Sequence, residues 1–276
     1  MSYCTGRSIA LRVKQLTETI PDILTRIVAR KREELTSLSH SYAGLESRAA
    51  SRLGDRRSFA TALRSHSPAV IAEIKQASPS KGLLSHDFQP SRTARQYELG
   101  GAAALSVLTD RDFFQGSLDD LASARAAVSI PVLRKDFTID KLHVLEAAAH
   151  GADAILLIAA ILSTREMRDF RELAAQFGMA ALVEVHDADE LRPALDSGAE
   201  IVGVNNRNLR NFEVKLETSL DLAGLMPASI LKVSESGIHG PADVRRLMDA
   251  GYTAFLVGEH LMKSGDPAEA LRRLCS

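Results

Sequence analysis

Polar side chains that can move protons or hold anions close short apolar runs at several places in this chain. The residues that close these runs are Glu73, Lys75, Lys135, Glu184 and Asn205. Burying such groups at the end of a strand costs roughly several kcal/mol unless partners compensate for the lost hydration. Their repetition therefore indicates one reactive site assembled from several strands.

The first of these runs ends with two charged residues that share a face. Glu73 and Lys75 are two apart, so on a strand both side chains point to the same side. They can exchange protons or bind an anionic group there. The alternative is an internal ion pair that only fills space in the core.

Lys135, which closes the predicted strand 131–135, has three chemical interpretations. Lys135 is followed by Asp136 and can act as a Schiff-base nucleophile, as a general acid or as a fixed cation for an anionic substrate. Its protonation depends on burial and on nearby carboxylates such as Glu73. The alternative is a salt bridge with Asp136 at the rim of the site.

A carboxylate, that of Glu184, closes the apolar run 181–183. Glu184 fits a general base or acid with a shifted pKa. The alternative is that it only pairs with His186 or Arg207. His186 stands next to Asp187 and is predicted to begin a helix and not to act as a catalyst.

The amides of Asn205 and Asn206 and the guanidinium group of Arg207 follow the apolar run 201–204. The Asn205 amide can both donate to and accept from a substrate hydroxyl, and the planar fork of Arg207 can bind a carboxylate. Asparagine also favours turns, and for Asn206 we prefer that interpretation.

Small residues follow the last two runs. Gly237 comes after Glu235 and Ser236, and Gly258 comes before Glu259. Small residues in these loops let backbone N–H groups approach a phosphate, which parallel barrels commonly bind there. A tight turn between strand and helix is the alternative use of each glycine.

The elements that must position these residues alternate along the chain. Predicted strands span 69–75, 103–108, 131–135, 153–159, 180–185, 200–204, 230–235 and 253–258, and predicted helices span 91–100, 118–128, 140–150, 164–177, 187–197, 217–224 and 240–250. Eight strand–helix units predict an α/β fold, a closed (β/α)8 TIM barrel. An open doubly wound sheet is less favoured because no Gly-x-Gly-x-x-Gly follows the first strand.

The front of the chain adds elements outside the barrel pattern. Apolar residues spaced for one helical face predict an additional N-terminal capping helix over 22–38, and a second short helical segment near 45–64. Residues 1–20 hold no firm element and are expected to form a loosely structured extension. Residues 21–276 are then a single barrel domain.

The composition of the chain excludes several classes of binding partner. The chain has 276 residues and a formal net charge of −1, so no basic face predicts nucleic-acid binding. No apolar stretch approaches the roughly 20 residues that span a membrane, and no signal peptide is evident. Cys4 and Cys275 show no metal-ligand spacing. We expect a cytoplasmic protein without a metal.

Taken together, the motifs resemble those of the indole-3-glycerol-phosphate synthase family. The matching stretches are 71–75 with 77–82, 106–110 with 113–118, 131–137, 182–186, 205–209, 212–214, 234–238 and 254–259, and the front helix, 27–34, is similar to the family's capping helix. They follow one another from about residue 21 to the C-terminus.

The resemblance implies a reaction and a set of roles. The family closes an indole ring on 1-(2-carboxyphenylamino)-1-deoxyribulose 5-phosphate, releasing carbon dioxide and water without a cofactor. It implies catalytic roles for Lys135, Glu184, Glu73 and Lys75, substrate binding by Ser78, Phe137, Asn205, Arg207, Leu209, Glu235 and Ser236, and phosphate binding by Gly237, Gly258 and Glu259. Leu133 and Leu156 are further candidates to pack on the benzene ring.

Two other functions stay open from sequence. Another phosphosugar barrel enzyme would use Lys135 to form a Schiff base, and a catalytically silent barrel would serve as a scaffold for a protein partner. The intact set of buried charges disfavours the scaffold. The substrate is the expected partner, and we expect a monomer or a weak homo-oligomer.

Overall fold

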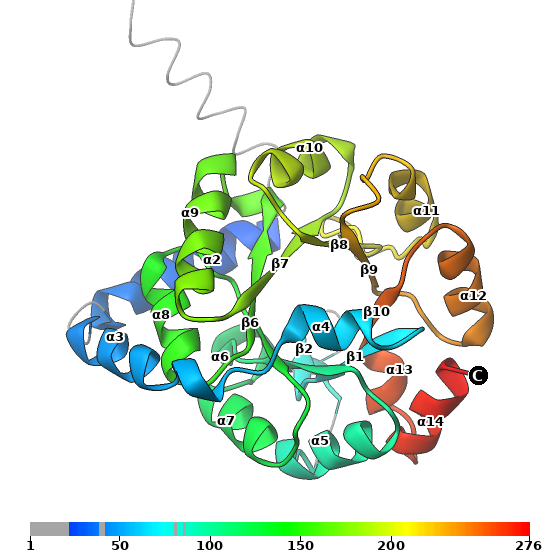
Figure 1. Cartoon of the computed structure of the whole chain (residues 1–276), viewed down its shortest axis with the longest axis horizontal. Coiled ribbons are helices and arrows are strands. Elements are labelled where there is room, and N and C mark those ends of the chain that lie inside the picture. The colour runs from blue at the N-terminus through cyan, green and yellow to red at the C-terminus, as the bar shows by residue number, and fades with distance from the viewer. Residues whose placement is uncertain (1–21, 39–41, 80–81, 85–86) are drawn as a thin grey trace, which may run out of the picture.

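Eight parallel strands close into a barrel in this computed structural model, which describes residues 22–38, 42–79, 82–84 and 87–276. Around the ring the strand order is β1-β10-β9-β8-β7-β6-β5-β4 (Figure 1). The strands are β1 (Ala69–Ile74), β4 (Ala104–Leu108), β5 (Val132–Lys135), β6 (Ala154–Ile158), β7 (Ala180–Val185), β8 (Ile201–Asn205), β9 (Leu231–Glu235) and β10 (Ala254–Val257). The predicted (β/α)8 barrel is confirmed, and the predicted strand ends agree within two residues.

A ring of helices surrounds the strands (Figure 1). In chain order after β1 these are α5 (Pro90–Leu99), α6 (Arg111–Phe114), α7 (Leu118–Ala126), α8 (Lys141–Ala149), α9 (Thr164–Gln176), α10 (Ala188–Asp196), α11 (Glu217–Ala223), α12 (Pro241–Asp249), α13 (Glu259–Met262) and α14 (Pro267–Leu274), with a 3-10 turn η3 (Ala159–Ile161) after β6. The short α6 and α13 have too few residues for a helical period, so the sequence did not predict them. The terminal α14 was also missed.

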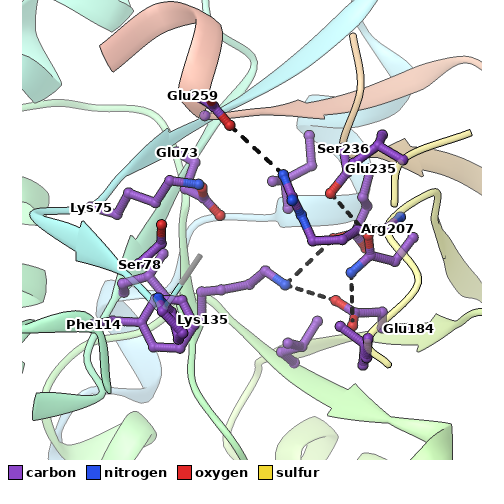
Figure 2. Close-up of a pocket in the computed structure, with 18 of the residues that line it drawn as sticks. Glu73, Lys75, Ser78, Phe114, Lys135, Glu184, Arg207, Glu235, Ser236 and Glu259 are labelled. Atoms are coloured by element: carbon purple, nitrogen blue, oxygen red, sulfur yellow. Dashed lines mark hydrogen bonds and ion pairs between the residues drawn. The ribbon is translucent and has the colours of Figure 1, made fainter. Parts of the chain in front are cut away.

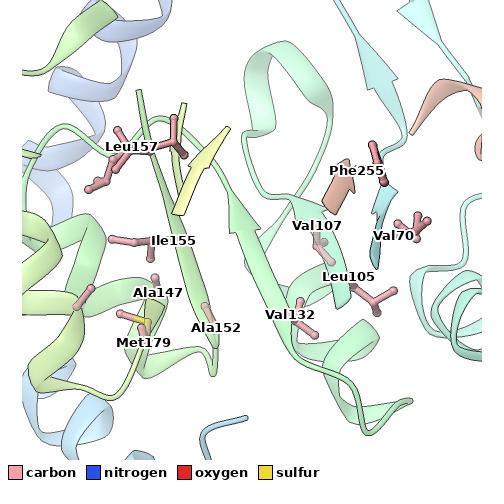
Figure 3. Packing of buried hydrophobic residues seen from close by; sticks show 14 of the residues in the cluster. Val70, Leu105, Val107, Val132, Ala147, Ala152, Ile155, Leu157, Met179 and Phe255 are labelled. Atoms are coloured by element: carbon pink, nitrogen blue, oxygen red, sulfur yellow. The ribbon is translucent and has the colours of Figure 1, made fainter. Parts of the chain in front are cut away.

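The strand pleat divides each strand between two cores. Val70, Ala72 and Ile74 of β1 pack against the outer helices, whereas Ala69 and Ile71 join a second cluster inside the barrel. Figure 3 shows the outer layer, where side chains of several strands meet the helices. Because side chains alternate along a strand, the inward phase that contains Ile71 continues to Glu73.

Local capping determines where helices begin and end. The Ser163 side chain accepts from the backbone N–H of Glu166, and the Glu166 carboxylate accepts from the N–H of Ser163 in return. This reciprocal capping confirms the start of the helix predicted at residue 164. Behind α5 and α8, Gly101 and Gly151 have φ values of 92° and 88°, which glycine adopts without the steric cost of a Cβ atom.

Helices from the front of the chain cover both ends of the barrel. In the predicted segment 45–64 the structure has two helices, α3 (Tyr42–Ser51) and α4 (Phe59–Arg64), with a 3-10 turn η2 (Leu53–Asp55) between them. Phe59 and Leu63 of α4 join the inner cluster beside the first residues of the strands, so α4 closes the amino-terminal end (Figure 1).

The N-terminal helix lies at the opposite end. Helix α2 (Asp22–Leu38) confirms the predicted capping helix, and its Leu24 and Ile27 join the inner cluster near the carboxyl ends of the strands. A two-stranded hairpin of β2 (Ala77–Ser78) and β3 (Gly82–Leu83) follows β1 and was not predicted. The predicted extension 1–20 lies outside the described residues.

An arginine holds the amino-terminal end together. Arg56 donates to three backbone carbonyls, those of Phe177 at 2.9 Å, Ala152 at 2.9 Å and Ala148 at 2.7 Å. These carbonyls lie near the ends of α8 and α9, so one side chain joins the α3–α4 connection to two units of the barrel.

We predict that Arg56→Met destabilises the fold without changing the chemistry. Since it removes three charge-assisted hydrogen bonds to backbone carbonyls, of which only that of Ala148 also accepts from the N–H of Gly151, the free energy of unfolding should fall by about 2–3 kcal/mol. Urea denaturation measures this, with the exposed Arg64→Met as the control. Loss of turnover in the folded variant at low temperature would contradict a purely structural role.

Candidate active site

A cavity of about 380 Å³ opens at the carboxyl ends of the barrel strands. All fourteen residues predicted for the site line it, namely Glu73, Lys75, Ser78, Lys135, Phe137, Glu184, Asn205, Arg207, Leu209, Glu235, Ser236, Gly237, Gly258 and Glu259. Leu156 also lines it. Leu133 does not, because it is fully buried in the inner cluster below the cavity.

The Lys135 ammonium lies at the centre of the charged part of this cavity (Figure 2). Its Nζ atom is 2.7 Å from Glu184 Oε2 and 3.4 Å from Glu235 Oε2. These carboxylates come from β7 and β9, so three strands bring their charges together. The predicted alternative, a rim salt bridge with Asp136, is wrong: Asp136 pairs with Arg134 and Lys31.

The electrostatics keep Lys135 charged. Burial acts against the ammonium, but the carboxylates of Glu184, Glu235 and Glu73 outweigh it and raise the pKa of Lys135 well above its ordinary value. At neutral pH this side chain is therefore a cation with a proton to donate. A Schiff-base nucleophile needs the neutral amine, so this environment does not favour it.

Glu184, in contrast, is held without its proton. Burial alone would raise the pKa of Glu184, but the Lys135 cation and His186 lower it well below the ordinary value. The His186 ring lies 3.3 Å from Glu184 and 2.9 Å from Glu190, and these carboxylates raise the pKa of His186 to about 10 against the effect of burial. An ionised Glu184 can accept a proton from a substrate.

Glu235 differs from Glu184 although both face Lys135. Burial, together with the charges of Glu184 and Glu73, raises the pKa of Glu235 to about 8 despite the nearby lysine. Its carboxyl group fills space beside Gly203 of β8, where a Cβ atom would come within 2.1 Å of Oε1. The glycine thus makes room for a third acidic group.

The Glu73–Lys75 pair predicted on β1 forms in the structure. The Lys75 ammonium donates to Glu73 Oε1, and both side chains face the cavity (Figure 2). A Cβ atom on Gly258 would come within 2.2 Å of the same Glu73 oxygen. Gly258 therefore provides space for this carboxylate, a reason for glycine that the phosphate prediction did not include.

Asn205 joins the strands at the other side of the cavity. Its Nδ2 donates to Glu184 Oε1 at 3.2 Å, and its Oδ1 accepts from Ser236 Oγ at 2.9 Å and from the backbone N–H of Arg207 at 3.1 Å. The orientation of the Asn205 amide is fixed by these three bonds. Neighbouring Asn206 is buried and bonds Ser234 and Ser236, a tertiary role beyond the turn predicted for it.

Arg207, Glu259 and the turn at Ser236–Gly237 line the same part of the cavity. Arg207 Nη2 is 3.7 Å from Glu259 Oε2, so both predicted binding residues meet (Figure 2). Ser236 and Gly237 have φ values of 66° and 78°. For a serine this left-handed backbone is uncommon, and such a local strain is found more often at functional sites.

The remaining wall is apolar. Phe114 and Phe137 have ring centroids 6.1 Å apart, and Leu156, Leu209 and residues of α2 complete this end. No binding role was predicted from the sequence for Phe114, for Ile23, Leu24 and Ile27, or for His239, which also line the cavity. His260, expected beside the phosphate site, lines the cavity too. The apolar face of 22–38 was visible in the sequence, but not what it covers.

Two features are absent from the described part of the chain, a metal-binding cluster and a membrane-spanning helix. No group of three or more His, Cys, Asp or Glu side chains is arranged to hold a metal ion. No helix there is both long and apolar enough to cross a bilayer.

The arrangement separates two kinds of chemistry. A charged half holds a protonated lysine beside an ionised and a protonated carboxyl group, and an apolar half offers flat surfaces for a ring. Such a cavity can bind an anionic aromatic molecule and pass protons to and from it.

Sequence comparisons give this geometry a family. The family model described as indole-3-glycerol phosphate synthase matches residues 24–274. Proteins of that name from Desulfotalea psychrophila and Aromatoleum aromaticum are 51% and 52% identical to the chain, over 92% of it and 98% of each relative.

Solved structures show the fold alone. A thiamine phosphate pyrophosphorylase from Pyrococcus furiosus aligns with a TM-score of 0.56 and 17% identity, over 75% of this chain and 93% of that one. An N-acetylmannosamine-6-phosphate 2-epimerase from Clostridium perfringens also gives 0.56, with 18% identity, over 72% and 89%.

We predict that Glu235 makes folding less favourable as the pH rises. Since the pKa of Glu235 rises from its ordinary 4.5 to about 8 on folding, the folded state holds an extra proton between these values, and its stability falls through that window. Glu235→Gln mimics the protonated form. Its advantage in free energy of unfolding over wild type should therefore grow from pH 5 to pH 8.

Urea denaturation at several pH values measures this difference. The exposed Glu172→Gln is the control and should follow the wild-type curve. Parallel curves for Glu235→Gln and wild type would show that Glu235 is ionised throughout.

Proposed function

This chain belongs to the indole-3-glycerol phosphate synthase family of tryptophan biosynthesis, and from that premise we propose how its cavity carries out the reaction. The chain converts 1-(2-carboxyphenylamino)-1-deoxyribulose 5-phosphate to indole-3-glycerol phosphate. As a reaction class we propose a carboxy-lyase. The observation that carries the proposal is the position of the Lys135 Nζ atom in the cavity, 2.7 Å from Glu184 and 3.4 Å from Glu235.

Ring closure, the first step, requires a proton donor. The ring carbon that bears the carboxylate attacks the ketone carbon, and the carbonyl oxygen takes the electron pair. We assign Lys135 to donate a proton to that oxygen, which becomes a hydroxyl group. The carboxylate then leaves as carbon dioxide, and its bonding electrons restore the aromatic ring.

Dehydration needs a base and an acid. Glu184 is ionised and suits removal of a proton from the methylene carbon beside the nitrogen. The electrons of that C–H bond form the new ring double bond as the protonated hydroxyl group leaves as water, and the nitrogen keeps its hydrogen. Glu73 and Lys75, joined as an ion pair at the opposite wall, are the second acid–base pair available for this stage.

The two ends of the cavity fit the two ends of the substrate. We assign the benzene ring to the apolar wall at Phe137 and Leu209, and the phosphate to the loops at Ser236–Gly237 and Gly258–Glu259, where backbone N–H groups can approach it. Ser78, Asn205 and Arg207 are proposed to hold the substrate's carboxylate and hydroxyl groups, with Glu235 beside them.

Location and assembly extend the proposal. A biosynthetic enzyme that acts on a phosphorylated metabolite is expected in the cytoplasm. One chain supplies every cavity residue named above, so a monomer or a weak homo-oligomer suffices. The substrate is the only small-molecule partner that this mechanism needs, and it requires no cofactor.

The direct test is indole formation by the purified chain. The sequence contains no tryptophan, so the fluorescence of the product can be followed without an indole background from the protein. An increase with the carboxyphenylamino-deoxyribulose phosphate is expected. A folded protein that gives none would contradict the proposed activity, and borohydride trapping on Lys135 would then indicate Schiff-base chemistry.

We predict that Lys135→Met lowers kcat by about 10²-fold or more, because a general acid contributes roughly that factor. Steady-state fluorescence kinetics measure it, with the exposed Lys215→Met as the control. Thermal unfolding of both variants verifies that they fold. A kcat within fivefold of wild type would remove Lys135 from the mechanism.

We predict that Arg207→Lys raises KM more than it lowers kcat. The variant keeps the charge but loses the planar fork that binds an oxyanion through two parallel hydrogen bonds, so substrate binding should weaken. Steady-state kinetics measure both constants, and the fold increase in KM should exceed the fold decrease in kcat. A fall in kcat at unchanged KM would place Arg207 in the chemical step.

A further inference from the structure

The N-terminal helix forms part of the cavity wall. Ile23, Leu24 and Ile27 of α2 line the cavity, and Leu24 and Ile27 are also packed in the inner cluster of the barrel. Lys31 is four residues beyond Ile27, so it lies on the same face of the helix one turn further. The helix therefore presents apolar residues and then one lysine to the barrel.

That lysine is buried with its charge. Lys31 is only 4% exposed, and its Nζ atom lies 3.0 Å from Asp110 Oδ2 and 2.9 Å from Asp136 Oδ1. Burial acts against the ammonium, but both aspartates outweigh it and raise the pKa of Lys31. Glu34 lies 3.2 Å away on the same helix.

The two aspartates belong to the segments that carry the aromatic wall. Asp136 directly follows Lys135 on β5, and its Oδ1 accepts the backbone N–H of Phe137 at 2.8 Å. Asp110 follows β4, and its Oδ1 accepts the N–H of Phe113 at 2.8 Å, which starts the short helix that holds Phe114. One lysine thus contacts the supports of both cavity phenylalanines.

Asp136 itself cannot move easily. Its Oδ2 accepts from Thr109 Oγ1 at 2.6 Å and from Arg134 Nη2 at 3.0 Å, and Arg134 also bonds Glu146 and the carbonyl of His143 on α8. The barrel side of the contact is rigid for this reason. Loss of Lys31 would therefore free the helix and not the strand ends.

We propose that Lys31 is a positioning residue, whose ion pairs with Asp110 and Asp136 hold α2 against the cavity so that Ile23, Leu24 and Ile27 complete the ring-binding wall. This rests on the proposed function for the identity of the ring. A second contact, between exposed Arg30 and Asp112, joins the same elements at the surface. Exposed pairs contribute little, so the buried lysine carries the contact.

The expected consequence is weaker substrate binding with intact chemistry. If the helix covers the cavity for only about a tenth of the time without Lys31, the apparent affinity falls about tenfold, because only the closed fraction binds. Lys31→Met should then raise KM about tenfold with a kcat change below about threefold. The Lys135 site itself is unchanged.

A double variant separates this effect from simple charge imbalance. Lys31→Met leaves two buried aspartates short of a cation, which can destabilise the fold. In Lys31→Met/Asp110→Asn the net charge of the cluster equals that of wild type, and asparagine can still cap the helix at 111–114. The raised KM should persist in the double variant. The exposed Arg32→Met, on the same helix, is the control and should match wild type.

Hydrogen exchange tests the position of the helix without any reaction. Peptides covering 22–38 should exchange faster in both Lys31 variants than in wild type, whereas peptides covering α12 at 241–249 should not change. Faster exchange everywhere, or a normal KM in folded variants, would overturn the proposal. If wild type turns over no substrate, the proposed function fails, and the exchange result still decides whether Lys31 holds the helix.

Discussion

The ammonium of Lys135 and the carboxylates around it constrain the rest of the structure. A buried lysine is stable only if anions surround it, and Glu184 and Glu235 reach it from β7 and β9. Three carboxyl groups in one place repel one another, so they cannot all be ionised. The result is one low and one raised pKa among similar residues, which is the condition for proton transfer in both directions.

Glycines, which have no side chain, provide the space for these carboxyl groups. Gly203 and Gly258 leave room for Glu235 and Glu73, whose oxygens would otherwise lie within about 2 Å of a Cβ atom. In a barrel the inward positions of neighbouring strands share one small interior. A large catalytic side chain on one strand therefore requires a small residue on the next.

The two ends of the barrel use the front of the chain differently. At the amino-terminal end, α4 fills the interior with Phe59 and Leu63, and Arg56 bonds backbone carbonyls, which serves stability. At the carboxyl end, α2 leaves a cavity and covers it with apolar residues anchored by Lys31. The helices that precede the barrel therefore serve stability at its amino-terminal end and cover the cavity at its carboxyl end.

The sequence by itself determined the barrel and the ends of its strands, because short apolar runs separated by helices place the strand ends on one face. The fourteen residues proposed for the site, several of them only through the family resemblance, all line the cavity. The sequence could not tell that Lys135 pairs with Glu184 and not with Asp136, since that depends on which strands are neighbours across the ring. It predicted α2 from its apolar face but not that Ile27 lines the cavity or that Lys31 is buried. Those contacts join residues about 80 to 100 positions apart, and only tertiary packing brings them together.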